Sequence, residues 1–181
     1  MPRNIASFQT ASAQETQSLG RRLAERLLEC MADPGLANAR VAVSGPLGCG
    51  KTQLAKGLFE VFGVERDRVV SPSFTLINEY GEGFSHLDLY RLKSWEELES
   101  LGLEEILEHP RLAVIEWAQR FDILERWGLE HLEVRMDYLF PSGGGGGDSD
   151  RDSRRIVVKP RGLTYHSLIR GWTGDPVGLA S

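Results

Sequence analysis

Hydrophobic residues recur at helical spacing in several parts of the chain. Ser12-Ala13-Gln14-Glu15 has the form of a capping box, and the apolar positions that follow predict a helix from about Ala13 to Met31. A second helix is predicted from Lys51 to Phe62, with Gly63 as its C-terminal stop. Both segments carry an apolar face, so each is expected to pack against a core.

The segment from Ser94 to His109 is helical in pattern, broken or bent near Gly102, and rich in glutamate. A solvated surface is one interpretation of its acidic face, and a docking face for a basic partner is the other. Ala118 to Trp127 is expected to form a short helix.

Other stretches have the patterns of strands. Two runs are almost continuously apolar, as buried strands are: Arg40–Ser44 and Arg111–Ile115. Four more form two predicted strand pairs, the first of them a hairpin around Gly81-Glu82-Gly83: Phe74–Tyr80 with Phe84–Tyr90, and His131–Tyr138 with Arg155–Lys159. Because the stretch Gly45–Thr52, between a predicted strand and a predicted helix, also fits the phosphate-loop pattern G-x-x-x-x-G-K-[ST], we expect a single-domain P-loop NTPase-like α/β fold, a mixed sheet with helices on both faces.

The bulk composition narrows the domain organisation and the class of protein. A chain of 181 residues that is 41% hydrophobic can bury one sizeable core, and we expect one domain over residues 1–172 and a C-terminal tail over 173–181. Within the domain, about 141–153 is so rich in Gly, Ser and charge that a mobile loop is predicted.

The net charge of -5 argues against a surface that neutralises a phosphate backbone, so any contact with nucleic acid is expected through a partner. The two cysteines suggest no disulfide framework, and no signal peptide or membrane span is evident. These features are typical of a cytoplasmic protein.

The stretch Gly45-Pro46-Leu47-Gly48-Cys49-Gly50-Lys51-Thr52 lies between a predicted strand and a predicted helix and fits the phosphate-binding pattern G-x-x-x-x-G-K-[ST]. Its glycines allow backbone N–H groups to surround a phosphate chain at the positive end of the helix dipole. Lys51 would reach the β- and γ-phosphates, and the Thr52 hydroxyl would bind Mg²⁺. The predicted nucleotide-binding residues in this region are Gly45, Gly48, Cys49, Gly50, Lys51, Thr52 and Gln53.

Hydrolysis also needs a carboxylate near the metal, and two acids are candidates. Glu116 lies at the C-terminal end of a predicted buried strand. In an open α/β sheet the C-terminal ends of the strands face the ligand, so Glu116 is expected beside Thr52. Asp88 lies late in the hairpin, and alternation from Leu87 and Leu89 would turn its side chain away from the core. On spacing alone, Asp88 could equally be a solvent-facing strand residue.

Together these motifs resemble the bacterial TsaE (YjeE) family, the small ATPases of threonylcarbamoyladenosine synthesis on tRNA. The matching segments cover about residues 12 to 140: the N-terminal helix with Thr16 and Leu19-Gly20, the loop Gly45–Thr52, Ser71–Leu76, His86–Arg91 and Ile115–Trp117. The stretches H-x-D-L-Y-R and S-P-[ST]-[FY]-T are more specific than the phosphate loop itself.

The resemblance implies a role for each matching residue. ATP and Mg²⁺ would be the cofactors, with Lys51 on the phosphates, Thr52 and Glu116 at the metal, Asp88 as the acid that orients or activates water, and Thr75 in a switch-like loop that senses the γ-phosphate. The catalytic residues would be Asp88 and Lys51. The family also implies docking on the tRNA threonylcarbamoyladenosine synthase proteins of the TsaD and TsaB type, with slow, partner-stimulated hydrolysis. Trp117 is either the family tryptophan beside the metal or a packing aromatic.

The loop departs from the family at two positions. Family loops usually have Asp at the position of Pro46 and a small residue at that of Cys49. Pro46 is expected to stiffen the loop entry without removing the later amides. Cys49 lies near a helix N-terminus and Lys51, surroundings that lower a thiol pKa, so nucleotide is expected to slow its alkylation.

Two other functions remain compatible with the loop. A small-molecule P-loop kinase would need an acceptor pocket and a basic lid, and a non-hydrolysing binding module would use nucleotide only to set its conformation.

Overall fold

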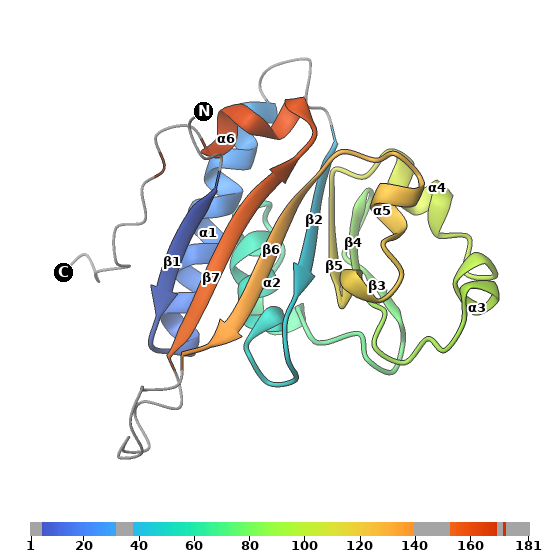
Figure 1. Cartoon of the computed structure of the whole chain (residues 1–181), viewed down its shortest axis with the longest axis horizontal. Coiled ribbons are helices and arrows are strands. Elements are labelled where there is room, and N and C mark those ends of the chain that lie inside the picture. Colours follow the sequence, from blue (N-terminus) through green and yellow to red (C-terminus); the bar gives the residue numbers. More distant parts are fainter. Residues whose placement is uncertain (1–4, 32–37, 140–152, 170–171, 173–181) are drawn as a thin grey trace.

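The computed structural model describes residues 5–31, 38–139, 153–169 and 172, and Figure 1 shows the arrangement of its elements. The predicted loop at about 141–153 and the predicted tail at 173–181 lie outside the described residues, apart from Ser153. Both remain predictions.

The described strands form one sheet in the order β1-β7-β6-β2-β5-β4-β3. The strands are β1 (Ala6–Thr10), β2 (Ala39–Ser44), β3 (Ile77–Glu79), β4 (Phe84–Asp88), β5 (Leu112–Glu116), β6 (His131–Tyr138) and β7 (Arg154–Arg161). The central strands β4, β5, β2 and β6 are parallel, β3 and β7 run antiparallel to them, and β1 pairs antiparallel with β7. The mixed sheet is confirmed, but β1 was not predicted.

Helices cover both faces of the sheet, as predicted. They are α1 (Ala13–Met31), α2 (Lys51–Val61), α3 (Trp95–Glu99), α4 (Leu103–Glu108), α5 (Ile123–Arg126) and α6 (His166–Ile169), with short 3-10 turns at Arg66–Arg68, Ala118–Arg120 and Leu163–Tyr165. Successive residues of β2 pack into the two helical layers in turn. Val41 and Val43 pack with α1 and α2, which lie behind the strands in Figure 1. Ala42 packs with the layer of α3, α4 and α5.

Local signals placed the ends of α1 and α2 to within one residue. The Ser12 hydroxyl accepts from the Glu15 N–H at 3.1 Å, and the Glu15 carboxylate accepts from the Ala11 N–H at 2.8 Å. Helix α2 ends at Val61, one residue before the predicted Phe62, and Gly63 follows as its stop, with Gly63 N–H donating to Glu60 O and Val64 N–H to Phe59 O. The acidic segment is broken at Gly102 into α3 and α4. The predicted helix at 118–127 is only a 3-10 turn followed by α5.

Two glycines set the position of α2 against α1. A Cβ atom on Gly57 would lie 2.0 Å from Gln17 O, and one on Gly20 would lie 2.3 Å from Leu54 O, so the helices cross with their backbones in contact. Because α2 begins at Lys51, this close packing also holds the end of the phosphate loop in place.

No helix among the described residues is long and apolar enough to cross a bilayer.

We expect Gly57→Ala to lower the free energy of unfolding by about 2–3 kcal/mol, because the added methyl group must push two helix backbones apart. Alanine normally stabilises a helix interior relative to glycine, so a loss reports the close approach. Gly128→Ala is the control: Gly128 has a positive φ of 66° but nothing within 4 Å of a Cβ atom, so its cost is expected to be about 1 kcal/mol. Urea unfolding measures both, and an unchanged or raised stability for Gly57→Ala would contradict the packing.

Candidate functional site

The phosphate loop connects the end of β2 to the start of α2. Gly48 and Gly50 have φ angles of 76° and 99°, a region that residues with a Cβ atom rarely adopt. Gly50 is the N-cap of α2, and no side chain caps the helix there. The first amides of α2 therefore face the loop without a side-chain acceptor, the arrangement in which a helix N-terminus binds an anion.

Lys51 is folded back over the loop and is only 4% exposed. Its ammonium donates to Gly45 O at 3.1 Å and Pro46 O at 2.9 Å. It also lies 4.1 Å from the centre of the Trp117 ring, a cation–π contact. Trp117 itself has a φ of 61°, an unfavourable conformation for a residue with a Cβ atom. The end of β5 therefore holds an aromatic ring directly against Lys51.

Glu116 lies beside Thr52, as predicted. The Thr52 hydroxyl donates to Glu116 Oε1 at 2.8 Å. The same oxygen lies 2.9 Å from Nε2 of His86, which is fully buried, and His86 Nδ1 lies 3.3 Å from the Tyr80 hydroxyl. A His86 tautomer with its proton on Nε2 donates to Glu116 and accepts from Tyr80, so all three side chains are joined.

Asp88 is buried, with 1% exposure, and does not face solvent. Alternation was misleading because both faces of β4 are covered: Phe84 packs in the layer of α1 and α2, Leu87 packs in the layer of α3, α4 and α5, and all five residues are buried. Asp88 Oδ1 accepts from the Tyr90 N–H at 2.9 Å, and Oδ2 accepts from Ser73 and, at 3.4 Å, from Ser71. The carboxylate is therefore held by three donors at the same sheet edge as Glu116.

These groups line one cavity of about 290 Å³. Its walls are formed by Ala13, Leu47, Gly48, Gly50, Lys51, Thr52, Gln53, Ser71, Ser73, Asp88, Glu116, Trp117 and Arg154. The cavity thus brings together most of the predicted nucleotide-binding, metal-binding and catalytic residues. Gln53 also accepts a hydrogen bond from Gln17 at 2.6 Å, which ties the site to α1.

The donor set of the cavity suits Mg²⁺ with a phosphate chain. Thr52 and Glu116 offer a hydroxyl and a carboxylate oxygen, and protein sites for Mg²⁺ typically use one or two carboxylates and leave other positions to water and phosphate. Among the described residues, no three His, Cys, Asp or Glu side chains gather as a metal site of their own. A metal held jointly by protein and nucleotide fits both observations.

Thr75 is not brought to the cavity. It is exposed, and its hydroxyl donates to Asn78 Oδ1 at 2.8 Å. Its segment reaches the site through Ser71 and Ser73 instead, which sequence reasoning did not assign although the S-P-S stretch had been singled out. His86 was missed in the same way inside the H-x-D-L-Y-R stretch.

The expected lowering of the Cys49 thiol pKa is wrong. Its side chain is fully buried, and burial raises the pKa of the Cys49 thiol, outweighing Lys51, which lowers it. The thiol lies under the loop, where a Cβ atom on Gly45 would approach the Cys49 sulfur to 2.9 Å. Any contact of Cys49 with nucleotide would be made by its backbone.

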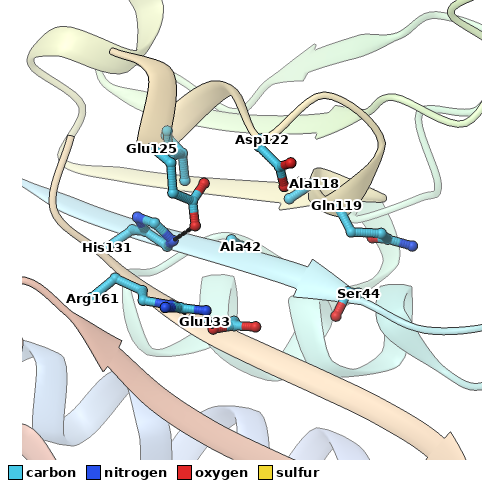
Figure 2. Close-up of a pocket in the computed structure, with 10 residues that line it drawn as sticks. Ala42, Ser44, Ala118, Gln119, Asp122, Glu125, His131, Glu133 and Arg161 are labelled. Carbon is cyan, nitrogen blue, oxygen red and sulfur yellow. Dashed lines mark hydrogen bonds and ion pairs between the residues drawn. The ribbon is translucent and has the colours of Figure 1, made fainter. Parts of the chain in front are cut away.

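A second cavity, of about 90 Å³, lies between β2, β6 and the segment 118–125 (Figure 2). Two pairs of its polar side chains face one another: His131 Nε2 lies 3.4 Å from Glu125, and Arg161 donates to Glu133 at 2.6 Å. Of the predicted site residues, none lines this cavity. The larger cavity at the phosphate loop is therefore the candidate site.

Comparison with known proteins identifies similar chains. A family model described as "Threonylcarbamoyl adenosine biosynthesis protein TsaE" matches residues 10–139. The tRNA threonylcarbamoyladenosine biosynthesis protein TsaE of a Nostoc species is 41% identical over 166 residues, covering 88% of this chain and 88% of that protein. The protein of the same name from Mycobacterium bovis is 36% identical over 136 residues, covering 68% of this chain and 74% of that protein. The crystal structure of Bacillus subtilis YdiB superposes with a TM-score of 0.60 at 25% identity, covering 92% of each chain.

We expect Cys30, which is partly exposed, to be alkylated in the folded protein much faster than Cys49. Iodoacetamide labelling followed by mass spectrometry of the peptides measures both rates, with labelling in urea as the control that both thiols can react. Since burial already protects Cys49, Mg-ATP should not change its rate. Rapid labelling of Cys49 that nucleotide suppresses would contradict the buried position.

Proposed function

Because the chain belongs to the TsaE family, we propose that it binds Mg-ATP at the Gly45–Thr52 loop and hydrolyses it slowly in support of threonylcarbamoyladenosine formation on tRNA. The observation that carries this proposal is the gathering of Lys51, Thr52, Asp88 and Glu116 around one cavity of about 290 Å³. A phosphate loop alone would support binding, whereas two buried carboxylates beside it support hydrolysis.

Each side chain has a role that its contacts support. Lys51 would leave the Gly45 and Pro46 carbonyls and bind phosphate oxygens, while the loop amides hold the chain. Thr52 and Glu116 would hold Mg²⁺, which neutralises charge on the phosphates when bound. Asp88 would orient a water molecule and take its proton as that water attacks the terminal phosphorus and ADP leaves.

The geometry of Asp88 favours this assignment over a purely structural role. Its two oxygens accept from Tyr90, Ser73 and Ser71, so the carboxylate has a defined orientation at the cavity wall. A carboxylate oxygen has two lone pairs, and acceptor capacity remains for a water molecule. Fixed orientation of this kind is what a general base requires.

For the partner, we propose docking on proteins of the TsaD and TsaB type. Large apolar side chains are exposed on segments that border the cavity: Leu47 is 69% exposed, Phe74 84% and Tyr90 42%. Tyr90 also stacks on Trp117, with ring centres 4.8 Å apart, and its backbone N–H holds Asp88. A protein that covers these side chains would therefore touch both the lysine side and the carboxylate side of the cavity.

We expect Asp88→Asn to lower kcat for ATP hydrolysis by about 100-fold or more, because the amide cannot take a proton from water. Its affinity for Mg-ATP should stay close to that of the wild type, whereas Lys51→Ala should weaken binding itself. Phosphate release and nucleotide titration measure the two effects, with Asp137→Asn at the end of β6 as a control outside the cavity. Unchanged turnover in Asp88→Asn would remove the catalytic assignment.

Tight binding without turnover in the wild type under any condition would favour a binding module, and ADP formation dependent on a metabolite would favour a kinase.

We expect Phe74→Ser to weaken the apparent affinity for TsaD- and TsaB-type partners by about fivefold or more, with basal hydrolysis unchanged. Leu163→Ser is the matched control, because Leu163 is 81% exposed but does not line the cavity. The measurement is the rate of phosphate release against partner concentration. Equal stimulation of both variants and the wild type would exclude Phe74 from the interface.

A further inference from the structure

The outer side of the phosphate loop is held by the ends of two strands. Tyr138 is the last residue of β6 and Arg154 the first of β7, and the two are partners in the antiparallel register. The Tyr138 hydroxyl donates to Leu47 O at 3.0 Å, and Arg154 Nε donates to Cys49 O at 2.7 Å. We call this pair of side chains, Tyr138 and Arg154, the hairpin clasp.

Holding those carbonyls also orients two amides. A peptide group is planar, and the peptides of the described residues are trans, so each C=O points opposite to the N–H of the next residue. A fixed Leu47 carbonyl therefore sets the direction of the Gly48 N–H, and a fixed Cys49 carbonyl sets that of the Gly50 N–H. These are amides of the loop that the phosphate-binding pattern uses.

The glycines of the loop allow this close approach. A Cβ atom on Gly48 would lie 3.0 Å from the Tyr138 hydroxyl, and one on Gly50 would lie 3.3 Å from Arg154 Nε. Arg154 is only 7% exposed, so its side chain has been taken out of water to reach the loop. Burying a cation costs free energy that its hydrogen bonds must offset, which makes an incidental contact a poor explanation.

We propose that Tyr138 and Arg154 are positioning residues that hold the Gly48 and Gly50 amides ready for the phosphates of the nucleotide. The inference rests on the proposed function, since it concerns the same loop. A loop already held in its binding conformation loses less conformational entropy when the ligand binds, so the clasp raises affinity. Arg154 also lines the cavity, which adds positive charge near Lys51.

The hairpin clasp raises the affinity for nucleoside diphosphates and for nucleoside triphosphates alike. The loop amides surround the α- and β-phosphates, which ADP and ATP share. A contact with the γ-phosphate would instead affect ATP alone. The ratio of the two affinity losses therefore separates positioning of the loop from direct contact with the transferred group.

The experiment uses the full chain with Tyr138→Phe, which removes one hydroxyl, and Arg154→Met, which keeps length but removes the donors. Arg155→Met is the matched control, because Arg155 is the neighbouring residue and is exposed. We expect each clasp variant to have about three- to tenfold weaker affinity for both Mg-ADP and Mg-ATP in equilibrium titration, which is the effect of one hydrogen bond. The affinities of Arg155→Met should equal those of the wild type. Unchanged affinities in both clasp variants, or a loss confined to Mg-ATP, would overturn the proposal.

A second readout needs no nucleotide. In 15N NMR relaxation of the free protein, the Gly48 and Gly50 amides should have lower order parameters in the clasp variants, because the N–H directions are no longer fixed, whereas amides in the middle of β2 should not change. Equal order parameters at Gly48 and Gly50 in all proteins would overturn the clasp. If the wild type binds no nucleotide, the proposed function fails, and this relaxation result still decides whether the clasp orients the loop.

Discussion

Parallel backbone pairing of β4, β5 and β2 determines where every candidate catalytic group lies. The register places Glu116 opposite Val43 on one side and opposite Asp88 on the other. Just beyond it, Trp117 N–H donates to Val43 O and Leu89 N–H to Glu116 O. A slip of one residue would turn every side chain of a strand to the opposite face. Because the strands are buried on both faces, the core opposes such a slip, and the carboxylates and the loop stay together.

Hydrogen bonds lead from this sheet edge to the segment of residues 70–75 by two routes. Glu116 is joined through His86 to Tyr80, whose single hydroxyl proton can go either to His86 Nδ1 or to the Val70 carbonyl, 3.5 Å away. Asp88 is joined directly to Ser73 and Ser71. Both acids of the cavity are therefore connected to one exposed segment, so a change in that segment can reach each of them through hydrogen bonds.

Sequence reasoning located the elements well and the side chains less well. The loop, α1, α2 and the hairpin follow from local patterns of glycine, capping residues and apolar spacing, all of which act within a few residues. Alternation left a solvent-facing Asp88 open because it assumes one solvated face, whereas both faces of β4 are covered by packed layers. The burial of Cys49 and the contact of Arg154 with the loop depend on strands distant in sequence, which a local pattern does not contain.

Because the Lys51 ammonium already has contacts within the loop, a bound nucleotide would replace those contacts rather than simply add new ones. In this structure its ammonium already has two carbonyl acceptors and an aromatic ring, so the lysine serves as an internal ligand of the loop. A phosphate must compete with those partners, and the free energy it gains is the difference between the two sets of contacts. The same partners are available again whenever a phosphate ligand leaves, so these internal contacts of Lys51 oppose tight retention of any such ligand at the loop.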